Sequence, residues 1–242
     1  MSLRGKKVVI IGGTSGIGFA VAEGAIAEHA EVVVASSNAA NVDAAVKRLG
    51  QGVKGFPIDV TDEASVEAFF NGLGPIDHVV FTAGDWGDRG SGAIGEVDLD
   101  RAAETLLAVR FWGAARVAKH AHKHLPPTGS ITITDGTLAH RPMKGRALST
   151  AAAGGVEHLA KGLAMDLAPI RVNCVCPAMI RTDVWNSFPE DGREELFKRM
   201  TGHQPLPRIG EPSEVAEAYL YLMKAGYTTG QVLLVDGGSS LV

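Results

Sequence analysis

Seven residues near the start of the chain, Gly12-Gly13-Thr14-Ser15-Gly16-Ile17-Gly18, constrain the fold more than any other segment. They follow a continuous apolar run at residues 8–11, which predicts a strand covered on both faces, and they open a helical pattern of apolar residues. Glycines at such a junction allow a tight turn and a close approach of backbone N–H groups to an anion, and the positive end of the helix favours a phosphate there. The segment therefore predicts an α/β domain that binds a dinucleotide.

Strand and helix patterns alternate along the rest of the chain. Short apolar runs predict seven strands, at residues 8–11, 32–35, 53–57, 79–81, 131–134, 171–175 and 231–235. The longest helices are expected at residues 98–122 and 147–167, and one short helix within the polar segment 179–204. We therefore predict a single Rossmann-type domain over residues 1–242, a doubly wound parallel sheet of seven strands with helices on both faces.

Composition narrows the class of protein. The 242 residues, 45% hydrophobic and 21% charged, suit one globular domain. The formal net charge of -4 provides no basic footprint for nucleic acid. The N-terminus is too short and polar for a signal peptide, and no apolar run approaches the roughly 20 residues of a membrane span. We expect a cytoplasmic protein that binds neither nucleic acid nor membrane.

The cysteine and histidine patterns do not predict a metal site. Cys174 and Cys176 are the only cysteines, and no further ligand residues lie beside them in the sequence, so we expect a buried, reduced pair. His120 and His124 share a helix face, but a metal would need further ligands. We expect both histidines at the surface or at an interface between subunits.

Other motifs follow the glycine loop in a fixed order. The loop has the spacing G-x-x-x-G-x-G. After it come Asp59-Val60, then Thr82-Ala83-Gly84, then Pro177-Ala178-Met179-Ile180-Arg181-Thr182, and finally Val235-Asp236-Gly237-Gly238. Together they resemble the motifs of the short-chain dehydrogenase/reductase family over nearly the whole chain. The resemblance implies hydride transfer between a nicotinamide dinucleotide and a small-molecule substrate, in a homotetramer or homodimer.

The resemblance also implies which residues bind the cofactor. The glycine loop would hold the pyrophosphate, the end of the second strand the adenosine ribose, and the segments after the fourth and sixth strands the nicotinamide. The expected cofactor residues are Gly12, Thr14, Ser15, Gly16, Ile17, Gly18, Ser36, Ser37, Asn38, Asp59, Val60, Ala83, Gly84, Pro177, Ile180 and Thr182.

The choice between NADP and NAD depends on Ser36-Ser37-Asn38 at the end of the second strand. An acidic residue there would bind the ribose 2′-OH and repel a 2′-phosphate. Two hydroxyls and an amide can instead donate to a 2′-phosphate, although no Arg or Lys stands beside them. We expect NADP, with NAD as the alternative.

The proton relay implied by the resemblance is missing. Family members use a Tyr, whose pKa near 10 is lowered by a Lys four residues later, together with a Ser and an Asn. The ungapped match over residues 156–177 places Ser149 at the Tyr position and Ala153 at the Lys position. Gly136, beside Thr137, takes the Ser position, and Arg110 takes the Asn position. The three tyrosines lie elsewhere, at Tyr219, Tyr221 and Tyr227.

Three functions stay open at this point. The first is an oxidoreductase with a rebuilt proton relay, acting on a small anionic, imine or carbonyl substrate, with Arg110, Thr137 and Ser149 as candidate catalytic residues. The second is a catalytically inactive NAD(P)-binding sensor or oligomer partner, and the third is a lyase or isomerase.

Several polar and aromatic side chains are further candidates for the substrate side. Asp135 is a candidate partner of Arg110. The basic residues Arg141, Lys144 and Arg146 either bind an anion or are merely solvated. Trp86 and Trp112 either line a pocket or pack in the core or at an interface. By the resemblance, Trp185 lies in the segment that forms the family's substrate lid, and it either serves in a lid or simply packs.

Overall fold

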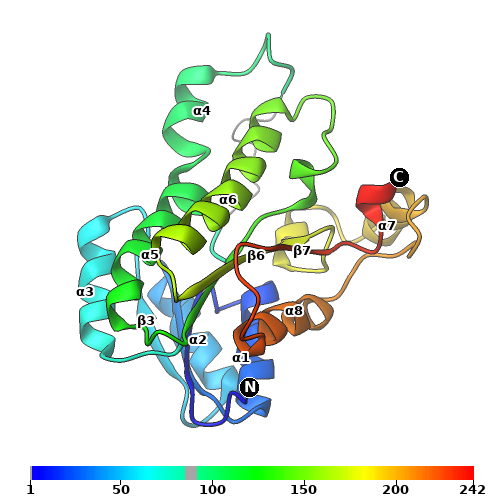
Figure 1. Cartoon of the computed structure of the whole chain (residues 1–242). Helices are drawn as coiled ribbons and strands as arrows, with labels where there is room; N and C mark the ends of the chain where they lie inside the picture. The colour runs from blue at the N-terminus through cyan, green and yellow to red at the C-terminus, as the bar shows by residue number, and fades with distance from the viewer. Residues whose placement is uncertain (1, 85–91) are drawn as a thin grey trace.

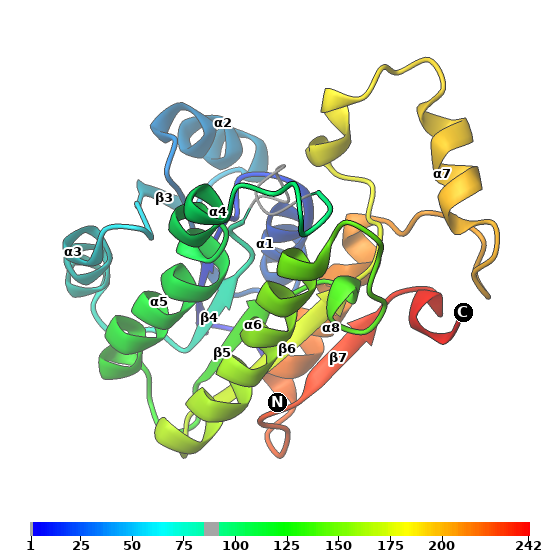
Figure 2. The same cartoon turned by 90° about the horizontal axis from the view of Figure 1, so that it is seen from above.

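Seven parallel strands form one sheet in the computed structural model, which describes residues 2–84 and 92–242. The strand order is β3-β2-β1-β4-β5-β6-β7. Figure 2 shows β4 to β7 side by side from above. The strands are β1 Lys7–Ile11, β2 Glu31–Ser36, β3 Lys54–Pro57, β4 His78–Phe81, β5 Ser130–Thr134, β6 Arg171–Pro177 and β7 Val232–Val235. The predicted Rossmann-type sheet of seven strands is confirmed.

Helices cover both faces of this sheet (Figure 1). One hydrophobic core lies between the sheet and α3, α5 and α6, and a second lies between the sheet and α1, α2 and α8. The α-helices are α1 Gly16–Ala27, α2 Ala39–Leu49, α3 Glu63–Leu73, α4 Leu99–Thr105, α5 Ala114–Ala121, α6 Ala147–Asp166, α7 Arg193–Thr201 and α8 Pro212–Lys224. No helix among residues 2–84 and 92–242 is long and apolar enough to cross a membrane.

The strand order reverses beside β1, which pairs with β2 on one side and β4 on the other. The loops that follow β1 and β4 therefore leave the same edge of the sheet side by side. The Thr82 hydroxyl, just after β4, donates to the backbone oxygens of Ile11 and Gly12, both at 3.2 Å. Ligands of open parallel sheets bind where the order reverses, because the two loops diverge there.

The predicted single helix at residues 98–122 is wrong. A π-helical turn, Ala108–Gly113, separates α4 from α5, and within it the Trp112 N–H donates to the Leu107 oxygen five residues back. A π-helical turn adds one residue to an otherwise continuous helical pattern, and periodicity judged over the whole segment does not resolve it. Trp112 is left half exposed, so it does not pack in the core of the protomer.

Two further expectations need correction. His120 is buried, with Nε2 3.3 Å from the Glu63 carboxylate on α3, and so it is not a surface residue. The segment 179–204 contains two helical elements, a 3-10 turn at Asp183–Ser187 and α7. The neighbours of His120 come from a helix about 57 residues earlier in the chain, which local periodicity does not detect.

We predict that α6 packs against a second copy of the chain. Gly154 on α6 has no atom within 4 Å of where a Cβ would lie, so Gly154→Arg fits within one protomer but obstructs a neighbouring helix. Sedimentation is expected to show a dimer or tetramer for the wild type and a monomer for the variant. Gly72→Arg on α3 is the matched control, because Gly72 is equally open. A variant that sediments like the wild type would contradict this interface.

Candidate cofactor and catalytic site

The glycine loop is pressed against the segment that follows β4. A Cβ on Gly12 would lie 2.6 Å from the Ala83 nitrogen, and a Cβ on Gly18 would lie 2.5 Å from Thr82 Oγ1. Gly12 also has φ +89°, a conformation that L side chains rarely adopt. Both positions therefore require glycine. The resulting loop shape allows its backbone to come close to a bound group.

The other loop residues lie at the start of α1. Thr14 is in the turn, and Ser15 precedes the helix in an extended conformation without making a side-chain cap. The first turn, which includes Ile17, carries no acidic residue, so its positive end is not neutralised locally. A Cβ on Gly16 would lie 3.0 Å from Thr182 Cγ2, so the predicted phosphate segment and the predicted nicotinamide segment meet.

The predicted adenosine end lies on the neighbouring strand and loop. Ser36 ends β2, Ser37 is exposed, and Asn38 caps α2 by accepting from the Asn41 N–H through its side-chain oxygen. The cap leaves the amide NH₂ of Asn38 available as a donor. Asp59 accepts hydrogen bonds from the Thr61 hydroxyl and N–H, which lower the pKa of its carboxyl.

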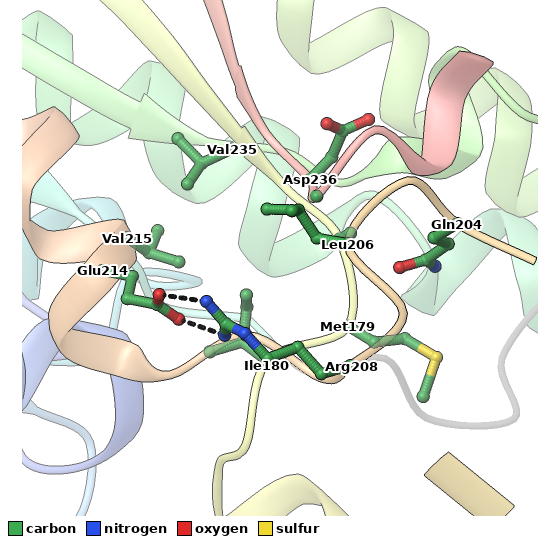
Figure 3. Close-up of a pocket in the computed structure, with 12 residues that line it drawn as sticks. Met179, Ile180, Gln204, Leu206, Arg208, Glu214, Val215, Val235 and Asp236 are labelled. Carbon is green, nitrogen blue, oxygen red and sulfur yellow. Dashed lines mark hydrogen bonds and ion pairs between the residues drawn. The ribbon is translucent and has the colours of Figure 1, made fainter. Parts of the chain in front are cut away.

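The predicted nicotinamide end contains a pocket (Figure 3). Pro177 ends β6, and the Ile180 carbonyl accepts from Trp185 Nε1 at 2.8 Å, so Trp185 braces this wall by packing. Val60, one of the expected cofactor residues, does not line this pocket and is buried against Gly113. The residues that line the pocket are Ala178, Met179, Ile180, Gln204, Leu206, Arg208, Gly210, Glu214, Val215, Val235, Asp236 and Gly237.

Arg110 reaches the same edge of the sheet from the π-helical turn. A Cβ on Gly84 would lie 2.6 Å from Arg110 Nε, so the guanidinium rests directly on the backbone that follows β4. Its Nε and Nη1 atoms are buried. The positive charge of Arg110 lowers the pKa of Asp135, which agrees with the expected proximity of these two residues.

Asp135 lies at the centre of a buried polar cluster just beyond β5. Its carboxyl hydrogen-bonds with Glu157 on α6, and Glu157 Oε1 lies 2.6 Å from His140 Nε2. Burial, reinforced by Glu157 and opposed by Arg110, raises the pKa of Asp135 to about 8. Asp135 is therefore a largely neutral carboxylic acid at pH 7, which can donate a proton.

Sequence reasoning missed part of this cluster. Side-chain N, O and S atoms of His140, Glu157 and Cys176 lie within 4.8 Å of one another, although His140 and Glu157 are far from the cysteines in the sequence. Cys174 and Cys176 are buried and free of disulfides, as expected. The available signal was Glu157, an acidic residue on the core-facing side of α6.

The basic loop lies beside this cluster. The Arg141 guanidinium lies 2.8 Å from His203 Nε2, Lys144 is exposed, and Arg146 directly precedes α6. Anion binding by this loop stays a prediction. Trp86, the remaining candidate for a pocket wall, lies outside the described residues.

Comparison with known proteins decides the family. A family model described as Enoyl-(Acyl carrier protein) reductase matches residues 12–240. The short-chain dehydrogenase/reductase ucsE of Acremonium sp is 36% identical over 98% of this chain and 96% of its own length. The chain belongs to the short-chain dehydrogenase/reductase family.

Two solved structures of this oxidoreductase family share the fold of the whole chain. The MalC reductase/Diels-Alderase from Malbranchea aurantiaca superposes with a TM-score of 0.91 at 36% identity, covering 99% of this chain and 98% of that one. A small-chain dehydrogenase in complex with NADPH gives a TM-score of 0.84 at 34% identity, covering 98% of this chain and all of that one.

The positions that we predicted to correspond to the family's proton relay come from α6 and from the segment after β5. Ser149 and Ala153 are buried one turn apart on α6. Gly136 follows Asp135, and Thr137 starts a 3-10 turn whose first carbonyl accepts from the His140 N–H. Ser149, Thr137 and Arg110 stay candidate catalytic residues.

No tyrosine of the chain reaches these positions. Tyr219 on α8 is fully buried behind the sheet, where its hydroxyl lies 2.7 Å from Thr134 Oγ1, and burial raises its pKa further above 10. Tyr221 and Tyr227 are exposed. We infer that Tyr219 is a core residue and not a proton donor.

We predict that Tyr219→Phe lowers stability and leaves turnover unchanged. The substitution removes one buried hydrogen bond, which typically contributes about 1 kcal/mol to the free energy of unfolding. Thr134 still donates to the Phe81 carbonyl, so that donor stays satisfied. Urea denaturation measures the first effect and NADPH oxidation the second. Loss of turnover in a folded variant would show that Tyr219 takes part in the reaction.

Proposed function

We propose that this chain is an NADPH-dependent reductase of a small imine or carbonyl substrate, in which Asp135 replaces the family's tyrosine as the proton donor. The observation that carries the proposal is the Asp135 carboxyl, which is buried at the carboxyl edge of the sheet beside Arg110, where burial raises its pKa to about 8. A general acid works best when its pKa lies near the operating pH, and Asp135 meets that condition.

The residues present fit a dinucleotide phosphate. The glycine loop forms a backbone cradle in which a Cβ at Gly12 or Gly18 would clash, and the first turn of α1 offers N–H groups to a pyrophosphate. Ser36, Ser37 and Asn38 provide donors and no acidic group for the ribose end, which favours NADPH. The family member solved with NADPH supports the same choice. When bound, the cofactor supplies the hydride.

Asp135 completes the reduction. As hydride adds to the carbon of the C=N or C=O bond, the nitrogen or oxygen takes the proton from the Asp135 carboxyl, whose O–H bond breaks. Arg110 then faces a newly formed carboxylate and stabilises it, because it remains charged at any working pH. Arg110 is also placed to hold a carboxylate of the substrate. The relative that is named both reductase and Diels-Alderase supports a reductase reading.

We predict that NADPH raises the melting temperature more than NADH does. A ligand at 100 times its Kd stabilises the folded state by about 2.7 kcal/mol, which a thermal shift detects easily. Gly12→Val is the control, because its side chain would occupy the cradle. Equal shifts with both cofactors would contradict a preference for NADPH. No shift with either cofactor would contradict dinucleotide binding.

We predict that Asp135→Asn lowers kcat/KM for NADPH-dependent imine or carbonyl reduction by about 10²–10⁴-fold while cofactor binding is retained. The protonated form of Asp135 is the active one, so wild-type kcat/KM should fall as the pH rises through about 8. That fall should be absent in Asp135→Asn. Tyr219→Phe is the buried control.

The outcomes of this experiment separate the alternatives. Tight NADPH binding without hydride transfer to any substrate in a carbonyl and imine panel would favour an inactive cofactor-binding protein. Full activity of Asp135→Asn would exclude Asp135 as the proton donor and would leave Ser149 and Thr137 as candidate catalytic residues.

A further inference from the structure

A connected run of polar side chains leads from Asp135 toward solvent. Asp135 and Glu157 are 1% and 5% exposed, whereas the His140 side chain is 33% exposed. Asp135 hydrogen-bonds with Glu157, and Glu157 hydrogen-bonds with His140 at 2.6 Å. The link between Glu157 and His140 is therefore short enough for proton transfer.

The surroundings of this run keep a proton within it. Burial, together with the adjacent Glu157 carboxyl, raises the pKa of Asp135 and favours its protonated form. Among residues 2–84 and 92–242, the other titratable groups that face Asp135 are Arg110, from the π-helical turn, and the thiols of β6. Burial raises the pKa of both cysteine thiols, so they stay protonated and carry no proton onward.

Helix geometry explains why Glu157 reaches Asp135. Ser149, Ala153 and Glu157 follow one another at intervals of four residues and share one face of α6, which is buried. Ser149 and Ala153 are small, and the first of them takes the tyrosine position by the family alignment. The next residue along the same face, Glu157, is the first carboxyl group that contacts Asp135 from this helix.

We propose that Glu157 and His140 return a proton from solvent to Asp135 after each turnover. This inference rests on the proposed function, because it requires Asp135 to lose its proton to the substrate. Glu157 and His140 act through Asp135 and do not touch the substrate.

The transfer is balanced at each step. After Asp135 protonates the product, its carboxylate lies beside Glu157. In the proposed return of the proton, the protonated form of His140 is the donor to Glu157. The His140 Nε2–H bond breaks and an O–H bond forms on Glu157. Glu157 then passes a proton to Asp135, and neutral His140 takes a new proton from water. No oxidant or reductant is consumed in these steps.

The first test does not depend on activity. After a laser-triggered pH jump from alkaline to neutral, time-resolved infrared spectroscopy of the cofactor-free protein follows the carbonyl band of protonated Asp135, assigned with Asp135→Asn. We expect His140→Gln, which keeps a donor to Glu157 but does not titrate, to slow the appearance of this band by about tenfold or more. The final amplitude at neutral pH should be unchanged. His158→Ala is the matched control, because His158 is exposed on α6 and its ring bonds to the Gly154 carbonyl of the same helix.

The second test uses turnover. In His140→Gln the first turnover of an enzyme equilibrated at neutral pH should match the wild type, since Asp135 starts protonated, while steady-state kcat should fall by about tenfold. Added imidazole should restore kcat in His140→Ala, because that position is open to solvent. A purely structural role for His140 would not respond to imidazole.

Two results would overturn the relay. One is an unchanged rate of the infrared band in His140→Gln, and the other is a drop in the first turnover as large as the drop in kcat. If the infrared band is slowed in His140→Gln but the wild type transfers no hydride, the relay is supported and the proposed reductase is contradicted.

Discussion

The close approach of the β1 loop to the β4 loop is the constraint on which the rest of the site depends. Gly12 and Gly18 bring the backbone of one loop against Thr82 and Ala83 of the other, leaving no space for a Cβ at either glycine. The Thr82 hydroxyl then ties the two loops together. This contact lies where the strand order reverses. The start of α1 and the carboxyl ends of β4 and β5 therefore border the same region of the sheet edge.

The same region combines two opposing electrostatic demands. An anion at the start of α1 needs positive potential, whereas a proton donor needs a carboxyl group that stays neutral. The protein separates these demands by depth. The first turn of α1 carries no acidic residue, while Asp135 is buried beside Glu157 and its charged form is disfavoured. Arg110 lies between the two, resting on Gly84.

Much of the fold was predictable because its signals are local. All seven strands lie within about two residues of their predicted positions, since each is a short apolar run bounded by polar turns. The π-helical turn was not predictable in this way, although it positions Arg110. The burial of His120 was also missed, because its partner Glu63 belongs to another helix. Glu157 was overlooked as a site residue for the same reason.

The sequence by itself determined the sheet, the need for glycine in the loop, the family resemblance and the lack of a tyrosine at the expected position. These follow from residue type, order and spacing along one chain. Only the tertiary structure decided which polar groups meet: β5, the loop after it, α6 and β6 bring Asp135, His140, Glu157 and Cys176 together. A pKa depends on burial and on neighbours in space, so the character of Asp135 as an acid is a property of the folded protein.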